Sequence, residues 1–325
     1  MNQTSTEAIP SISVVVPCYN AAATIEDCMR SVQAQTRNDW ELIVVDDGSH
    51  DNSRTVVLDL AQRDPRIRLH AQANAGPAAA RNCGVGLARG GIVAFLDSDD
   101  RWDPDHLALA TAMLDADPAL GVAFASCRIL NDHGLPTGQR TRAWTNGVAI
   151  ADILAGNPTA TCSSLVVRKA VFETVGGMRD DMVHAEDQEW LFRVIRHGWR
   201  LRSHNRTTVG YRTSAGGLSA NVERMFSGWR TFVQHARTLE PEIVARELPR
   251  ARAAMHLYFA RRMIRDGRFG MRPIEHVAQA VWAAPRVLLT SPTAVFTIAC
   301  AAVTGTVAPT VTHSIIMSIG KMRHA

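Results

Sequence analysis

The sequence predicts an α/β fold with a mostly parallel central sheet, followed by a C-terminal helical extension. Short apolar runs alternate with helical patterns from residue 11 to residue 97, and three of the four runs end in proline or in acidic residues. An Arg-rich helical pattern begins near residue 223. Alternation with short connections is typical of βαβ units, whose strands run parallel.

The first hundred residues contain four apolar, β-branched runs that predict buried strands. They cover residues 11–17, 40–47, 66–72 and 92–97. Helices are expected between them at residues 21–35, 49–64 and 76–91. In the first helix, Ile25, Met29 and Val32 share one face. The second helix has Asp51 or Ser53 near its start and Pro65 beyond its end.

The pattern loosens after residue 120. Strands are expected at residues 120–130, 161–169, 198–203 and 207–212, and a helix at residues 187–198. The Arg-rich stretch from Glu223 to Arg286 is expected to be helical, and its part at residues 251–286 predicts a helical hairpin broken at Gly267–Pro273. The predicted organisation has four parts. Residues 1–10 are a flexible N-terminal tail, and residues 11–220 are the α/β domain. Residues 221–286 are the helical extension, and residues 287–325 are an apolar tail.

The composition excludes several classes of protein. Of the 325 residues, 46% are hydrophobic, which is enough for a globular core. The formal net charge of +4 is mild and does not indicate a nucleic-acid partner. The six cysteines form no CxxC pair, so reduced thiols in the cytoplasm are expected rather than a zinc site or disulfides. The first eleven residues show no secretory signal.

Acidic residues follow two of the predicted strands. Asp46 and Asp47 end one strand, and Asp97 and Asp99 follow another. Ligands of open α/β sheets bind beyond the carboxyl ends of the strands. Residues two apart in an extended chain point the same way, so Asp97 and Asp99 could present two carboxylates to a hard divalent cation. The alternative is an acidic turn that caps a helix starting near Pro104.

Four motifs in order resemble the family-2 glycosyltransferases of the GT-A fold. They are "PCYN" at 17–20, "VDDGS" at 45–49, "LDSDD" at 96–100 and "EDQEW" at 186–190. One motif would be weak, but four at plausible spacing are specific. The resemblance covers about residues 10–220. It implies an inverting transferase with a UDP- or dTDP-linked sugar donor, Mn²⁺ or Mg²⁺, and a glycan or lipid-linked acceptor, acting in cell-surface polysaccharide or glycolipid synthesis.

The resemblance also implies roles for individual residues. Nucleotide contacts fall on Pro17, Tyr19, Asp46, Asp47, Arg81 and Asp97. Asp99 would bind the metal, Asp187 would be the catalytic base, and Arg212 is a candidate contact to the diphosphate. Ser214 stands where many relatives carry a histidine that helps to bind the metal or the diphosphate.

Structural alternatives remain for these residues. Asp46 is either near the ribose or structural, and Arg81 could pair with a nearby acid. Glu186 and Asp187 precede an amphipathic helix, so one of them could serve only to favour its positive N-terminus. Two other functions also remain open: a sugar-1-phosphate nucleotidyltransferase, for which the usual Gly-rich loop is missing, and a non-catalytic protein that binds nucleotide sugars.

The apolar tail raises the question of membrane contact. The stretch Val287–Thr312 contains no charged residue and is long enough to span a bilayer, but Pro292 and Pro309 interrupt it. The alternatives are a helix lying in the membrane interface or a tail packed on protein. The sequence favours peripheral attachment at the cytoplasmic face of the cell membrane, with the Arg-rich segment meeting anionic lipid.

Overall fold

The computed structural model describes residues 9–213, 217, 221–265, 267–268, 270–286 and 295–301. Most of the predicted N-terminal tail, Ser214 and most of the apolar tail lie outside these residues. The chain divides into two compact units. The first contains residues 1–150 and 157–220, and the second joins residues 151–156 to the chain from Asn221 onward.

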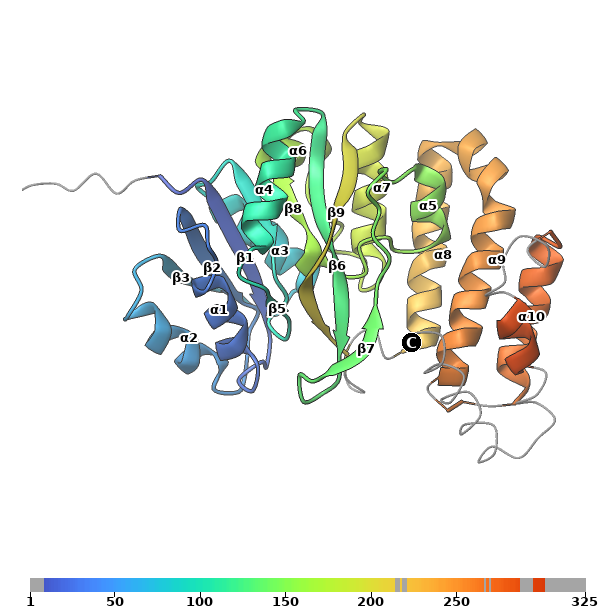
Figure 1. Cartoon of the computed structure of the whole chain (residues 1–325), viewed down its shortest axis with the longest axis horizontal. Helices are drawn as coiled ribbons and strands as arrows, with labels where there is room; N and C mark the ends of the chain where they lie inside the picture. The colour runs from blue at the N-terminus through green and yellow to red at the C-terminus, as the bar shows by residue number, and fades with distance from the viewer. Residues whose placement is uncertain are drawn as a thin grey trace, which may run out of the picture. The chain divides into compact units, whose positions relative to one another are not determined.

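The first unit is built on one sheet (Figure 1). Its strands are β1 (Ile12–Cys18), β2 (Trp40–Asp46), β3 (Ile67–Ala71), β4 (Ile92–Phe95), β5 (Arg101–Trp102), β6 (Leu120–Leu130), β7 (Pro136–Arg140), β8 (Val166–Arg168) and β9 (Arg200–Arg212). The order is β3-β2-β1-β4-β8-β6-β9-β5, and β7 pairs with β6. Strands β1 to β4, β6 and β9 run in one direction, and β5, β7 and β8 run against them. This confirms the predicted α/β class with a mostly parallel sheet.

Helices connect the strands of the first unit. They are α1 (Ile25–Gln33), α2 (Ser53–Ala61), α3 (Pro77–Leu87), α4 (His106–Ala116), α6 (Lys169–Val175) and α7 (Glu186–Arg196). Every residue of β1 and β2 is buried, as expected for central strands covered on both faces. Ile25, Met29 and Val32 of α1 pack into this core, so the predicted apolar face is confirmed. The core therefore fixes the carboxyl ends of β1 and β2.

Two predicted elements differ from the structure. The two strands expected at residues 198–203 and 207–212 are one continuous strand, β9, which pairs along the whole of β6. Shifts in the pairing between Phe124 and Cys127 accommodate the polar residues that seemed to separate the two strands. Within 161–169, only Val166–Arg168 forms a strand, because Cys162–Ser164 makes a 3₁₀ turn in which Thr161 accepts a hydrogen bond from the Ser163 N–H.

A buried carboxylate that the sequence analysis overlooked fastens the start of the sheet. The side chain of Glu41 in β2 is 1% exposed. It accepts hydrogen bonds from the Ser13 hydroxyl at 2.7 Å, from the Arg68 guanidinium at 2.8 Å, and from Arg89 through its backbone N–H at 2.7 Å and its Nε at 2.9 Å. Burial acts to raise the pKa of Glu41, but these hydrogen bonds outweigh it and hold the pKa below its ordinary value.

Replacing Glu41 by Gln is expected to lower the free energy of unfolding by about 1–3 kcal/mol at pH 7, because two guanidiniums lose their charged partner. A carboxyl group with a lowered folded pKa stabilises above its unfolded pKa of about 4.3, and this stabilisation is lost as the pH falls through the folded pKa. The free energies of unfolding of the wild type and of Glu41→Gln, measured by urea at pH 7 and at pH 3.5, should therefore differ less at pH 3.5.

The matched control for this substitution is Glu26→Gln. Glu26 pairs with Arg30 on the surface of α1, with side-chain exposures of 52% and 57%. Exposed pairs of this kind contribute little, so its effect should stay within about 0.5 kcal/mol. Equal losses in the two variants would contradict the role of Glu41.

The second unit is helical. It contains α5 (Ile150–Ala155), α8 (Val222–Leu239), α9 (Pro241–Arg265) and α10 (Met271–Ala283), and α8, α9 and α10 lie side by side in Figure 1. The Trp229 Nε1 donates to the Leu154 carbonyl at 2.9 Å, which ties α5 to α8. The predicted break between two helices is confirmed between Arg265 and Met271.

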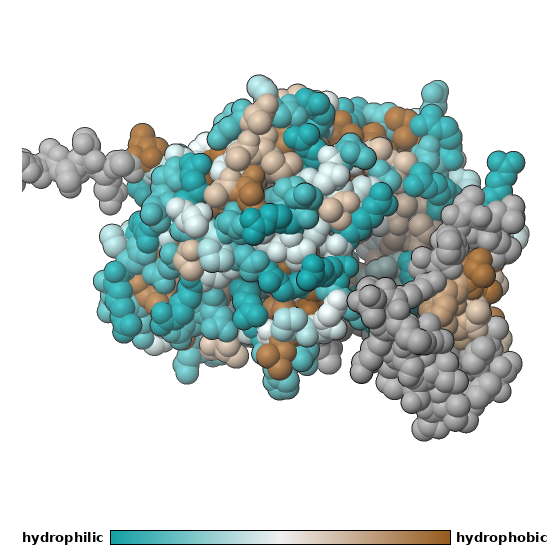
Figure 2. Space-filling view, viewed as in Figure 1, coloured by the Kyte–Doolittle hydropathy of each residue, from teal (hydrophilic) through white to brown (hydrophobic). Residues whose placement is uncertain are grey.

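Membrane contact was predicted from the apolar tail. In the described part of the chain, none of the helices combines the length and the apolar character needed to cross a bilayer. On the face of the first unit drawn in Figure 2, hydrophilic residues predominate and apolar ones are scattered, which is ordinary for a protein surface in contact with water.

Candidate active site

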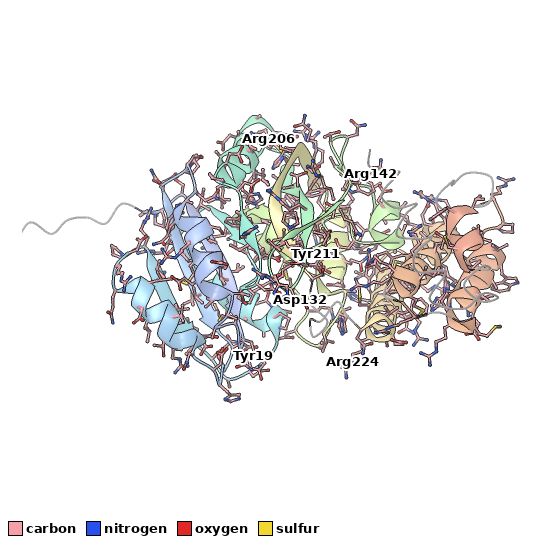
Figure 3. The ribbon with its side chains drawn as sticks, turned by 60° about the horizontal axis from the view of Figure 1, so that its bottom comes forward. Tyr19, Asp132, Arg142, Arg206, Tyr211 and Arg224 are labelled. Atoms are coloured by element: carbon pink, nitrogen blue, oxygen red, sulfur yellow. The ribbon has the colours of Figure 1, made fainter. Side chains whose placement is uncertain are left out.

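The carboxyl ends of β1 and β2 carry the first group of predicted nucleotide contacts. Pro17 belongs to β1, and Tyr19 follows it with 49% of its surface exposed. In Figure 3, Tyr19 lies at the rim of the unit. Asn20, next in the chain, has a positive φ of 49°, a conformation that non-glycine residues rarely adopt. The β1–α1 connection thus presents an exposed aromatic ring on a constrained backbone.

Asp46 is the last residue of β2 and is buried. One carboxylate oxygen accepts the Ser49 N–H at 3.2 Å, and the other accepts the Arg54 guanidinium at 2.9 Å. These contacts tie the turn after β2 to the first turn of α2. They suit the structural alternative for Asp46, while its contact to the nucleotide stays a prediction.

The Asp47 side chain holds the loop that precedes α3 through hydrogen bonds. Its Oδ1 accepts the Gln72 side-chain amide at 2.8 Å and the Ala75 N–H at 2.9 Å, and its Oδ2 accepts the Gly76 N–H at 2.8 Å. Gly76 has a φ of 89°, so this loop needs glycine there. An ionised carboxylate has about four acceptor positions, which leaves about one for a ligand.

Asp100 anchors the acidic loop after β4, a role that the sequence analysis missed. It is 2% exposed and accepts the Ser163 hydroxyl at 2.5 Å and the Arg212 N–H at 2.7 Å. Burial and the charge of Asp99 raise the pKa of Asp100 well above its ordinary value. The third acid of "LDSDD" was the only sequence signal for this role. Its partners, Ser163 and Arg212, lie far away in the sequence.

Arg81 joins the two acidic motifs. It lies on α3 and is 6% exposed. Its guanidinium donates to Asp97 at 2.6 Å and to Glu186 at 3.2 Å, the latter 105 residues away. Burial alone would lower the pKa of Arg81, but Asp97 raises it, so the group stays charged. Within the described residues, its Nε has no hydrogen-bond partner. The alternative that Arg81 pairs with acids therefore describes the ligand-free protein.

Asp187 lies in the first turn of α7, after Ala185, whose φ is 63°. Its carboxylate accepts the Asn157 side-chain amide at 2.5 Å and the Gln188 N–H at 2.7 Å. Burial raises the pKa of Asp187. Burial and the charge of Asp187 also raise the pKa of Glu186, to about 7. The structure thus holds the two acids in different settings: Glu186 faces a cation, and Asp187 faces an amide.

Asp99 is the predicted metal ligand. Burial, and then the charge of Asp97, raise its pKa to about 6. Arg212, the candidate diphosphate contact, donates to the backbone carbonyls of Asp99 and Asp132, both at 2.9 Å. Asp132 is an exposed residue of the β6–β7 connection and is labelled in Figure 3. Arg212 therefore holds the backbone of the acidic loop, and its charge also acts to lower the pKa of Asp99.

Among the described residues, no three His, Cys, Asp or Glu side chains are grouped so that they could hold a metal ion by themselves. A divalent cation with oxygen ligands still fits here. The loop places the like charges of Asp97, Asp99 and Asp100 close together, and among the described residues Arg81 forms an ion pair with Asp97 of these three. A Mg²⁺-type site commonly takes one or two carboxylates and completes its shell with phosphates and water.

Comparisons with known proteins identify relatives of the chain. The chain is 47% identical over 92 residues to the uncharacterized glycosyltransferase EpsJ of Bacillus subtilis, a match covering 28% of this chain and 27% of EpsJ. It is 29% identical over 215 residues to the putative teichuronic acid biosynthesis glycosyltransferase TuaG of the same organism, covering 65% of this chain and 82% of TuaG. The first of these relatives is thus matched over about a quarter of its length.

Two solved structures have a similar fold. S. aureus TarS 1–349 in complex with UDP-GlcNAc has a TM-score of 0.57 at 18% identity, covering 90% of each chain. The mannosyltransferase PcManGT of Pyrobaculum calidifontis, in complex with GDP-Man and Mn²⁺, has a TM-score of 0.52 at 19% identity, covering 96% of this chain and 80% of PcManGT. This likeness confirms the predicted GT-A type fold. A family model described as Glycosyl transferase family 2 matches residues 13–176, half of the chain, and the chain therefore belongs to that family.

Proposed function

We propose that the protein is an inverting glycosyltransferase. It moves a sugar from a UDP- or dTDP-linked donor to a hydroxyl group of a glycan or lipid-linked acceptor. One observation carries the proposal: Arg81 draws the acidic loop at Asp97 and the acidic helix start at Glu186 together, beyond the carboxyl ends of parallel strands. Family membership supports the same reaction.

The donor is proposed to bind along the ends of β1, β2 and β4. Tyr19 supplies an exposed ring for the base, and Asp47 uses its remaining acceptor position for a base N–H. Asp97, already within 2.6 Å of Arg81, contacts the ribose. Asp99 holds Mn²⁺ or Mg²⁺, which, when bound, stabilises the negative charge of the departing diphosphate. Mn²⁺ in the PcManGT structure supports this assignment.

Asp187 is proposed to take the proton from the acceptor hydroxyl. The Asn157 amide and the Gln188 N–H fix the orientation of its carboxylate. Its raised pKa makes it a stronger proton acceptor than an exposed aspartate, provided that it is ionised. The acceptor attacks on the face opposite the leaving diphosphate, so the anomeric centre inverts and no covalent sugar–enzyme bond forms.

The biological setting is proposed from the relatives. TuaG is named for teichuronic acid biosynthesis, which supports a role in cell-surface polysaccharide or glycolipid synthesis. UDP-GlcNAc in the TarS structure supports a UDP-linked donor. An enzyme acting on lipid-linked acceptors would work at the inner face of the cell membrane, through peripheral contact of its C-terminal segment.

The full chain should bind one nucleotide sugar and release its nucleoside diphosphate in a metal-dependent way. The measurement is thermal stabilisation by UDP-, dTDP- and GDP-linked sugars with Mn²⁺, followed by nucleoside diphosphate release and by NMR of the new linkage. A ligand at a hundredfold excess over its Kd stabilises by about 2.7 kcal/mol. Diphosphate release from a nucleoside triphosphate and a sugar phosphate would instead identify a nucleotidyltransferase. Binding without turnover would identify a non-catalytic protein.

A further inference from the structure

The helical unit contains a pocket that the proposed reaction does not use. It has a volume of about 450 Å³ and is lined by α8, α9 and α10. This size lies within the range of small-ligand sites, about 300–1,000 Å³. Lining residues on α8 recur from position 226 to position 237 at helical spacing, and those on α9 are four apart, at 248, 252 and 256. One face of each helix therefore contributes to the pocket.

Aromatic rings form part of the lining. Phe226 stacks on the buried Trp229 with 5.6 Å between ring centroids, and it lies 5.0 Å from the ring of His256. Trp282 also lines the pocket, although 80% of its surface is exposed. Trp282 thus offers an exposed aromatic face at the pocket, on which a ligand can lie.

The charge of the pocket is not balanced. Three arginines line it, Arg230, Arg237 and Arg252, and no Asp or Glu is among its lining residues. Within the described chain, none of the three forms an ion pair. Other arginines of the unit do, for example Arg246 with Glu247 and Arg250 with Asp152.

We propose that this pocket binds an anionic saccharide, a sugar chain that carries carboxylate or phosphate groups. Guanidiniums bind both groups through paired hydrogen bonds. A sugar ring can lie against Trp282, and the side-chain amides of Gln234 and Gln279, which also line the pocket, can bind its hydroxyls. The saccharide class rests on the proposed glycosyltransferase function. The pocket would then bind the acceptor polymer. Because its charged lining residues are arginines, this implies an acceptor polymer that carries acidic groups.

A lipid surface explains these features less well. The charged and aromatic side chains line a concave space, which suits a discrete ligand. A bilayer would instead require a convex apolar face with arginines at its border. The arginines also come from two different helices, α8 and α9, and converge on one volume.

The test uses the full chain, without donor or metal, and isothermal titration with tetragalacturonate and with mannopentaose 6-phosphate. Methyl-esterified tetragalacturonate and plain mannopentaose are the uncharged controls. We expect an acidic probe to bind at least tenfold more tightly than its control. The double variant Arg237→Gln/Arg252→Gln should lose at least tenfold in affinity, and Trp282→Ala should lose about three- to tenfold.

Arg246→Gln is the matched control, since Arg246 is exposed on α9 but pairs with Glu247 and does not line the pocket. It should bind like the wild type. An equal loss in this control would overturn the proposal, because the effect would then be one of overall charge. No binding of either acidic probe would also overturn it. So would phosphatidylglycerol vesicles that displace the probes and lose binding in the same variants, because the ligand would then be a lipid headgroup.

Binding and transfer can be separated. Asp187→Asn removes the proposed base in the other unit and should bind the acidic probes with unchanged affinity. If transfer is absent in the wild type but the probes bind and respond to the pocket variants, the saccharide site stands and the proposed reaction fails. If transfer occurs and the probes do not bind, the proposed reaction stands and the saccharide site fails.

Discussion

Replacing Asp187 by Asn is expected to lower the rate of sugar transfer by about two to four orders of magnitude, while the affinity for the nucleotide sugar changes by less than about threefold. Asn keeps the size of the side chain and its contact with Asn157 can reorganise, but it cannot accept the proton of the acceptor hydroxyl. Single-turnover rates and donor titration, measured on the same preparation, separate the two effects.

Glu186→Gln is the control for this substitution. Glu186 is adjacent in sequence, but its carboxylate contacts Arg81 and is buried. We expect Glu186→Gln to affect stability and donor binding more than the proton-transfer step. If Asp187→Asn transfers sugar normally and Glu186→Gln does not, the catalytic base is Glu186. If both variants are active, the base lies elsewhere in the protein.

Replacing Asp99 by Asn is expected to lower transfer by about two to three orders of magnitude, because the metal would lose its protein carboxylate and with it several kcal/mol of charge stabilisation. The affinity for nucleoside diphosphate should fall in Mn²⁺ and stay the same in chelator. Isothermal titration in the two buffers measures this difference directly.

Asp59→Asn, at an exposed position of α2, is the control for the loss of one carboxylate. It should transfer sugar at the wild-type rate. Undiminished transfer by the wild type in excess chelator would remove the metal from the proposed reaction altogether. Loss of donor affinity in chelator, caused by Asp99→Asn, would indicate that the carboxylate contacts the donor itself.

Local patterns predict the first half of the sheet because each strand there is a compact apolar run. Local patterns predict the strands after residue 120 less well, since these strands depend on partners that are distant in the chain. β9 is continuous only because it pairs along β6, and shifts in that pairing absorb its polar middle. Sequence patterns also give no sign of the β6–β7 hairpin, as every residue of β7 is exposed.

The motifs identified candidate residues at the site but not their partners. Asp99 and Asp187 stay predictions, with environments that suit their proposed roles. The contact of Arg81 with Glu186 spans 105 residues, and no spacing rule reaches that far. Arg212 stays a candidate contact to the diphosphate, and its bonds to two backbone carbonyls could not be read from the sequence. Such contacts depend on how the elements pack, which a single sequence does not encode locally.

The position of β9 limits how this enzyme can be shortened. The family match stops at residue 176, but β9 lies between β6 and β5 inside the sheet. A fragment ending there would leave a long open edge on β6 that invites pairing with other chains and aggregation. It would also bury the Arg81 cation without Glu186 and release the Asp100 carboxylate from the Arg212 backbone. The smallest autonomous folding unit therefore extends at least to Arg212, well beyond the conventional family boundary.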